Sequence, residues 1–186
     1  MIIGICGKSG SGKSTLSKKL INQYGSKIIH LDIDKIGHHV LTLPKVKEEL
    51  VNTFGKYIIT NNFIDRKKLG KIVFDSPKEM DKLTEITWKY MESEIDKIIL
   101  KNPEKIIILD WILLPKTKYL NKCNLKILLD IPYEIRKARA IKRDNITNEA
   151  FELREKSSLT YNELDFDYII KDNNYENIKR LVKIYE

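Results

Sequence analysis

The chain has 186 residues, 42% of them hydrophobic and 32% charged, which is enough for a sizeable core beneath a solvated surface. No apolar run approaches the roughly 20 residues that a membrane-spanning helix needs, and the short apolar amino terminus lacks the basic segment of a secretion signal. We therefore exclude a membrane protein and expect a cytoplasmic protein that is a monomer or a weak homo-oligomer.

The net charge of +8 raises the question of a nucleic-acid partner. The 34 Lys and Arg residues are spread along the whole chain among 26 acidic residues, and the longest basic run is Arg66-Lys67-Lys68. This spread is typical of a solvated lysine surface, and it fits attraction of an anionic small molecule equally well. We therefore expect no nucleic-acid partner.

Cysteine and histidine give no sign of a metal site. The two cysteines lie far apart, and the three histidines, His30, His38 and His39, do not have the spacing of metal ligands. Cys6 stands in an apolar run, so we expect it to be a small buried hydrophobic residue.

Short apolar segments alternate with helical patterns along the chain, which predicts an α/β fold with a parallel sheet flanked by helices. The predicted strands are Met1–Cys6, Lys27–Leu31, Lys105–Leu109, Leu125–Leu129 and Tyr168–Ile170. The predicted helices between and after them are Ser14–Tyr24, a segment from Pro132 toward Arg143, and a carboxy-terminal helix through Ile178, Leu181 and Val182.

Between Ile36 and Asn102 the strand signal disappears. Apolar residues recur there every three or four positions, which predicts the helices Lys45–Phe54, Asp65–Phe74 and Pro77–Leu100. A helical segment between two strands of one sheet is an insertion. In a small kinase, such an insertion (here about 36–102) is where an acceptor substrate would be held.

The first predicted strand leads into a glycine-rich loop that matches G-x-x-x-x-G-K-[ST] in full and is followed by an amphipathic helix. Its backbone N–H groups and the helix amino terminus form a nest for phosphates. Lys13 should reach the β- and γ-phosphates, Ser14 should bind Mg²⁺, and Thr15 should support the α-phosphate. The residues predicted to bind ATP or GTP are Gly7, Lys8, Ser9, Gly10, Ser11, Gly12, Lys13, Ser14 and Thr15.

Carboxylates stand at the ends of the strands that would flank this loop. Asp32 and Asp34 follow the second strand, and we assign Asp32 to accept the proton of an attacking hydroxyl and Asp34 chiefly to cap a helix starting near Lys35. Asp110 closes the third strand after four apolar residues, the Walker-B form, and is a candidate Mg²⁺ ligand. Many buried strands end in Asp, so the Walker-B form alone is weak evidence. The evidence for Asp110 comes from its predicted place near the glycine-rich loop.

A basic helical segment follows Pro132. Arg139 and Arg143 are four residues apart and share one helix face, where guanidinium groups could stabilise the transferred phosphoryl group beneath a lid of about residues 139–160. The alternative is a solvated face with Glu134 and Asp144 as partners, which the charge pattern alone favours. With the phosphate loop, these elements predict a single P-loop kinase domain over residues 1–186.

With these residues in place, the chain resembles the dephospho-coenzyme A kinase family over nearly its whole length. The matching segments are Gly4–Thr15, the D-x-D element at residues 32–34, the family's D-R-x-x-L-G-x-x-V-F at residues 65–74, R-x-x-x-R-D at residues 139–144, and residues 165–170. The resemblance implies that ATP with Mg²⁺ phosphorylates the ribose 3′-hydroxyl of dephospho-CoA. It also implies that Asp32 is the base, that Arg139 and Arg143 belong to the lid, and that Arg66 lies on the acceptor side.

The departures from the family pattern lie mainly on the acceptor side. Trp88-Lys89 stands where the family has His-Pro, and Ser158 replaces a Gln. Where the family reads P-L-L-x-E, residues Ile112–Lys116 keep the two leucines but have neither the Pro before them nor the acid at the end. A related P-loop kinase acting on another nucleoside or nucleotide, and a non-catalytic nucleotide-binding paralogue, are therefore alternatives.

Overall fold

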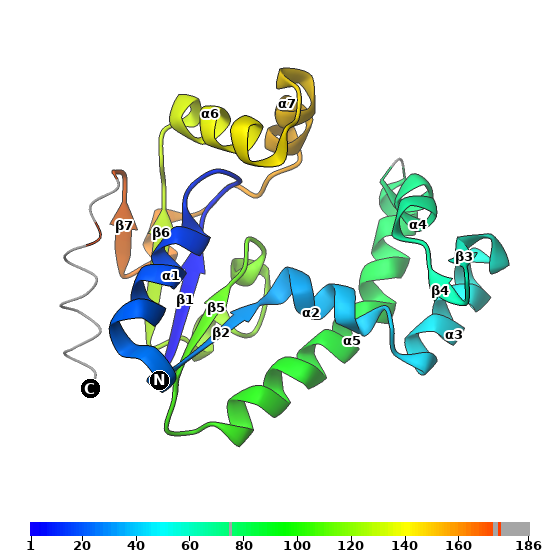
Figure 1. Cartoon of the computed structure of the whole chain (residues 1–186), viewed down its shortest axis with the longest axis horizontal. Coiled ribbons are helices and arrows are strands. Elements are labelled where there is room, and N and C mark those ends of the chain that lie inside the picture. The colour runs from blue at the N-terminus through cyan, green and yellow to red at the C-terminus, as the bar shows by residue number, and fades with distance from the viewer. Residues whose placement is uncertain (75, 173–174, 176–186) are drawn as a thin grey trace. The chain divides into compact units, whose positions relative to one another are not determined.

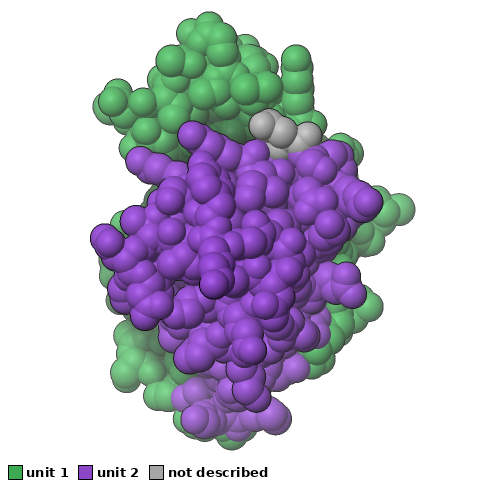
Figure 2. Space-filling view, turned by 90° about the vertical axis from the view of Figure 1, so that its right-hand side faces the viewer, with its two compact units in different colours: residues 1–32, 103–186 green, residues 33–102 purple. Residues whose placement is uncertain are grey.

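The computed structural model describes residues 1–74, 76–172 and 175. It divides the chain into two compact units, coloured separately in Figure 2. The sheet unit comprises Met1–Asp32 and Pro103–Glu186, and the helical unit comprises Ile33–Asn102.

A five-stranded sheet, in the order β2-β5-β1-β6-β7, forms the sheet unit (Figure 1). All four pairs of neighbouring strands are parallel. The strands are β1 (Ile2–Cys6), β2 (Ile28–Asp32), β5 (Ile106–Asp110), β6 (Leu125–Leu129) and β7 (Tyr168–Ile170). The sequence-based prediction of an α/β parallel sheet is therefore confirmed, and each strand lies within about one residue of its predicted bounds.

The central strands are almost wholly apolar because they are covered on both faces. Ile3, Ile5 and Ile108 are fully buried in one cluster with Leu16 and Leu20 of helix α1 (Lys13–Tyr24). Cys6 is also fully buried, as predicted, and burial raises the pKa of its thiol. This packing fixes the end of β1 and the start of α1, the two elements that the glycine-rich loop joins.

Two further helices follow β6 in the sheet unit, α6 (Tyr133–Asp144) and α7 (Asn148–Lys156). The Thr147 hydroxyl caps α7 by accepting from the N–H of Ala150 at 3.2 Å. The helix predicted through Ile178, Leu181 and Val182 lies outside the described residues. Single 3-10 turns occur at Gly25–Lys27, Lys56–Ile58, Leu114–Lys116, Leu120–Lys122 and Glu163–Asp165.

Four helices build the helical unit: α2 (Ile33–Val40), α3 (Pro44–Phe54), α4 (Arg66–Val73) and α5 (Pro77–Lys101). Their apolar faces form a separate core that contains Val40, Val46, Leu50, Ile58, Leu69 and Val73. Ser76 caps α5 and Pro77 occupies its first turn. The three helices predicted in this region are present. Among the described residues, no helix is both long and apolar enough to cross a membrane.

The expectation that this region contains no strand is wrong between residues 59 and 64. Strands β3 (Ile59–Thr60) and β4 (Phe63–Ile64) pair antiparallel around Asn61 and Asn62, whose φ angles are +49° and +66°. Asparagine adopts this left-handed conformation more readily than most residues. Strands of two residues are too short to show an alternating pattern, so periodicity could not reveal them.

The predicted role of Asp34 as a helix cap is also wrong. Helix α2 begins at Ile33, so Asp34 is an exposed residue in its first turn, and Asp32 is the residue that precedes the helix. The negative charge of Asp34 still interacts favourably with the helix dipole. The strand passes into the helix without the intervening loop that a cap near Lys35 would need.

Asp65 joins the hairpin to α4, and its replacement tests this connection. Its carboxylate accepts from the N–H groups of Lys67 and Lys68 at 3.0 and 3.2 Å and from the Thr60 hydroxyl at 2.9 Å. We expect Asp65→Ala to lower the Tm because the first turn of α4 loses its cap, whereas Asp65→Asn should keep most of it. Thermal unfolding followed by circular dichroism measures both. An equal loss in the two variants would mean that the charge, not the cap, matters.

Candidate active site

The loop between β1 and α1 is wound so tightly that its glycines are required. Gly7, Gly10 and Gly12 have φ angles of +148°, +78° and +96°. A Cβ atom on Gly10 would lie 2.2 Å from the carbonyl oxygen of Arg136, so the loop packs directly against the start of α6. Only glycine combines these backbone angles with such a close approach.

The loop also presents the positive groups that a phosphate chain needs. The Lys13 ammonium group folds back to donate to the Gly7 carbonyl at 2.8 Å, on the same loop. Helix α1 has Gly12 at its N-cap, a residue with no side chain to accept from the first N–H groups of the helix. Uncapped N–H groups at a helix amino terminus bind anions, so the loop offers backbone donors and an ammonium group together.

The candidate carboxylates emerge beside the loop because the strands are parallel and in register. Asp32 is the register partner of Asp110, and Asp110 is paired with Ile5 of β1. The Asp110 carboxylate is almost buried and lies 3.4 Å from Nε2 of His30 and 3.5 Å from the hydroxyl of Ser17. Asp32 is half-buried. The three strand ends thus bring Asp32, Asp110 and the phosphate loop to one edge of the sheet.

The oxygen donors at this edge suit a magnesium ion. Ser14 offers an exposed hydroxyl in the first turn of α1, and Asp110 offers a carboxylate. Magnesium keeps several waters and bridges to substrate phosphates, so it needs few protein ligands. No cluster of three or more His, Cys, Asp or Glu side chains that could cage a metal occurs in the part of the chain that the structure describes.

The two arginines of the predicted lid differ in their surroundings. Arg143 is exposed and donates to the carboxylate of its neighbour Asp144 at 2.7 and 2.9 Å, and Arg154 also pairs with Asp144. These contacts match the solvated-face alternative for Arg143, and they lower the pKa of Asp144 to about 2. Arg139, one turn earlier on the same helix, is half-buried.

Sequence reasoning missed the ionic contacts that fasten this loop. Arg136 is 6% exposed, and its Nε donates to the Ile131 carbonyl at 2.9 Å. Its two terminal nitrogens donate to Glu155 of α7 at 2.7 and 2.9 Å, and the same carboxylate accepts from Lys8 of the loop at 2.8 Å. Helical spacing could have predicted the burial of Arg136, because it lies four residues before Ala140 on the buried face of α6.

The residues that depart from the family pattern have structural partners here. In the helical unit, Trp88 donates to Glu92 at 3.1 Å and Lys89 to Glu49 at 2.8 Å. In the sheet unit, the carbonyl of Ile112 accepts from the buried hydroxyl of Tyr161 at 2.9 Å, and the Ser158 hydroxyl donates to the Glu155 carbonyl at 2.7 Å. These positions therefore help to hold the chain together.

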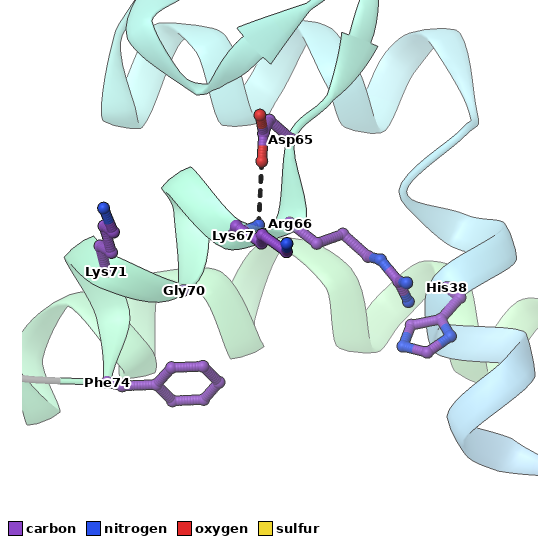
Figure 3. A pocket seen from close by; sticks show the side chains of 7 residues that line it. All are labelled: His38, Asp65, Arg66, Lys67, Gly70, Lys71 and Phe74. Atoms are coloured by element: carbon purple, nitrogen blue, oxygen red, sulfur yellow. Dashed lines mark hydrogen bonds between the residues drawn. The ribbon is translucent and has the colours of Figure 1, made fainter.

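The helical unit contains a cavity of about 830 Å³ that includes Arg66, the acceptor-side residue suggested by the sequence (Figure 3). Figure 3 shows the Arg66 side chain extending toward His38, while the Asp65 carboxylate is held by the N–H of Lys67. The cavity is lined by His38, Asp65, Arg66, Lys67, Gly70, Lys71 and Phe74. Its lining has three permanent positive charges and one negative charge that caps α4, so it suits an anionic ligand.

Comparison with known proteins identifies the family. A model of the family described as "Dephospho-CoA kinase" matches residues 1–177. The chain belongs to the dephospho-CoA kinase family. The enzyme named dephospho-CoA kinase from Fusobacterium nucleatum is 35% identical over all of this chain and 95% of its own length. The one from Aquifex aeolicus is 38% identical over 99% of this chain and 95% of its own.

Solved structures agree with this assignment. Dephospho-CoA kinase from Campylobacter jejuni has a TM-score of 0.61 and 25% identity, over 99% of this chain and 94% of its own. A shikimate kinase from Acinetobacter baumannii, at 12% identity and a TM-score of 0.54 over 100% of this chain and 94% of its own, shares the fold alone. The predicted P-loop kinase fold and family are therefore confirmed, whereas the roles of the individual site residues stay predictions.

The pH dependence of stability should report the ion pairs of Glu155. Hydrogen bonds, first from Arg136 and then from Lys8, lower the pKa of this carboxyl group from 4.5 to about 2. Because the pKa is lower in the folded state, the contribution is complete above the unfolded pKa and disappears as the pH falls toward about 2.

We expect Glu155→Gln to lower the Tm at neutral pH, and the difference from the parent protein to shrink between about pH 5 and about pH 2. Thermal unfolding across this range measures the difference. Asp144 titrates in the same window but is present in both proteins, so its contribution cancels. A difference in Tm that does not change with pH would contradict the ionic assignment.

Proposed function

We propose that the chain transfers the γ-phosphoryl group of ATP to the ribose 3′-hydroxyl of dephospho-CoA and so forms coenzyme A. The observation that carries this proposal is the family match over residues 1–177, which includes a complete phosphate loop. The parallel register of Asp32 with Asp110 beside that loop supports phosphoryl transfer as the reaction. We assign residues to the binding of the donor ATP and to the binding of the acceptor.

The donor side uses the loop and its neighbours. The backbone N–H groups from Gly7 to Thr15 surround the phosphates, and Lys13 exchanges its contact with the Gly7 carbonyl for phosphate oxygens. Ser14 and Asp110 would hold Mg²⁺, which would neutralise charge on the β- and γ-phosphates. Ser17 and His30 lie beside the Asp110 carboxylate and orient it.

Asp32 is the proposed general base. Its half-buried carboxylate accepts the proton of the 3′-hydroxyl, whose oxygen then bonds to the γ-phosphorus. The bond from that phosphorus to the bridging oxygen breaks, and ADP leaves with the electron pair. Arg139 and Arg143 stabilise the charge on the transferred group, and Arg143 must exchange Asp144 for phosphate oxygens to do so.

The acceptor side uses the cavity of the helical unit. Dephospho-CoA carries a diphosphate that requires positive partners and apolar segments that require contact surface. Arg66, Lys67 and Lys71 line the cavity and supply the charge. Phe74 is 78% exposed and supplies apolar surface at the same cavity. The helical unit therefore acts as the acceptor-binding part of a single kinase.

Replacing Asp32 tests the proposed base. We expect Asp32→Asn to lower kcat by about 10²- to 10⁴-fold, because the carboxamide cannot accept the hydroxyl proton. ATP binding should remain, since an Asn before α2 can still cap the helix. ADP formation with Mg-ATP and dephospho-CoA measures the effect. Asp34→Asn, two residues further along, is the matched control and should retain full activity.

The same assay with uridine, cytidine, AMP and shikimate tests the identity of the acceptor. Turnover with one of these compounds, and none with dephospho-CoA, would replace the proposal with another P-loop kinase activity. ATP binding without turnover on any acceptor would indicate a non-catalytic paralogue.

Removing a cation from the cavity tests the proposed acceptor site. We expect Arg66→Ala to raise the KM for dephospho-CoA by about tenfold, because a charge-assisted hydrogen bond to the diphosphate is lost. The KM for ATP should not change. Lys45→Ala removes an exposed charge of the same unit outside this cavity and should leave both KM values unchanged. An equal rise of both constants for Arg66→Ala would exclude a specific acceptor role.

A further inference from the structure

The phosphate loop, helix α6 and helix α7 are joined by three side chains, which we call the clasp: Lys8, Arg136 and Glu155. One carboxylate, that of Glu155, accepts from both cations. Lys8 donates to it at 2.8 Å, and Arg136 donates to it through two contacts of 2.7 and 2.9 Å. Two parallel N–H···O bonds fix the guanidinium and the carboxylate in one plane. The clasp therefore has a defined geometry, unlike a loose surface ion pair.

The contacts of Arg136 with the loop connect the clasp to the predicted phosphate nest. A Cβ atom on Gly10 would lie 2.2 Å from the Arg136 carbonyl oxygen, and Nη1 of Arg136 lies 3.5 Å from the Ser9 carbonyl oxygen. The backbone of Arg136 thus lies against the middle of the loop, while its side chain is anchored by Ile131 and Glu155. A shift of Arg136 would shift the loop with it.

The burial of Arg136 makes Glu155 necessary. The Arg136 side chain is 7% exposed, and a buried guanidinium without a carboxylate partner is strongly unfavourable. Without Glu155, Arg136 would have to move toward water or toward other acceptors such as the Ser9 carbonyl. Lys8 of the loop would also lose its carboxylate partner. Both changes alter the direction of the N–H groups that bind phosphates.

We propose that Glu155 is a positioning residue for the nucleotide, which acts through Arg136 and Lys8 to hold the phosphate loop in its binding conformation. We assign it no direct contact with either substrate. The inference rests on the proposed nucleotide-binding role of the loop, and it is independent of which hydroxyl accepts the phosphate. It assigns α7 a part in donor binding in addition to its place in the lid.

Calorimetric titration with Mg-ATP and Mg-ADP tests the proposal in the full-length protein. We expect Glu155→Gln, which keeps the shape but removes the charge, to raise the Kd for both nucleotides by about tenfold. In turnover assays the KM for ATP should rise while the KM for dephospho-CoA stays unchanged. Adenosine, which has no phosphate, should bind the parent and the variant equally.

Glu152→Gln is the matched control, because Glu152 lies on the same helix and pairs with Lys137 at 2.9 Å without contacting the loop. It should leave nucleotide binding unchanged. The variant Lys8→Met, alone and combined with Glu155→Gln, shows whether the effect passes through the clasp. The two substitutions together should raise the Kd by less than the product of their separate effects.

The outcomes separate the two proposals. A parent protein that does not bind ATP would overturn the proposed function itself. ATP binding that is equal in the parent and in Glu155→Gln, or tighter in the variant, would overturn the positioning role. A loss of Tm without a change in Kd would also overturn it, because it would leave Glu155 a purely structural residue.

Discussion

The parallel register of three strands is the constraint on which the rest of the site depends. Because β2, β5 and β1 run in one direction, their carboxyl ends lie at one edge, and register pairs Asp32 with Asp110 and Asp110 with Ile5. A shift of one residue would turn each side chain to the opposite face of the sheet. The apolar residues of β1 and β5 are buried, and their packing holds these two strands in the sheet. The carboxylates thus owe their position to residues with no chemical role.

The glycine-rich loop depends on a second constraint, its contact with α6. Its backbone comes so close to Arg136 that no side chain fits at Gly10. That contact brings a buried charge to the loop, and a buried charge needs partners of opposite sign. Glu155 meets this need from the next helix along the chain. The packing that shapes the nest therefore also determines which residues must surround it.

Most of the fold could be predicted from the sequence because its signals are local. Buried strands such as β5 and β6 are unbroken apolar segments, and the phosphate loop is a contiguous motif. The hairpin of β3 and β4 was missed because two residues cannot display a period. The clasp was missed for a different reason: Arg136 and Glu155 are 19 residues apart on separate helices, and Lys8 and Glu155 are 147 apart. Contacts at such separations depend on how elements pack, which a single sequence does not state.

The division into two units indicates where the specificity of such a kinase resides. The sheet unit contains the phosphate loop and the strand-end carboxylates, features that P-loop kinases share, so it says little about the acceptor. In the helical unit, Trp88 and Lys89 pair with glutamates and do not line the cavity described there. Replacement of the family's His-Pro pair at these positions therefore leaves the cavity's cationic lining intact. Arg66 and Lys71 of α4 both line that cavity, so we propose that this helix, rather than the altered positions on α5, binds an anionic acceptor.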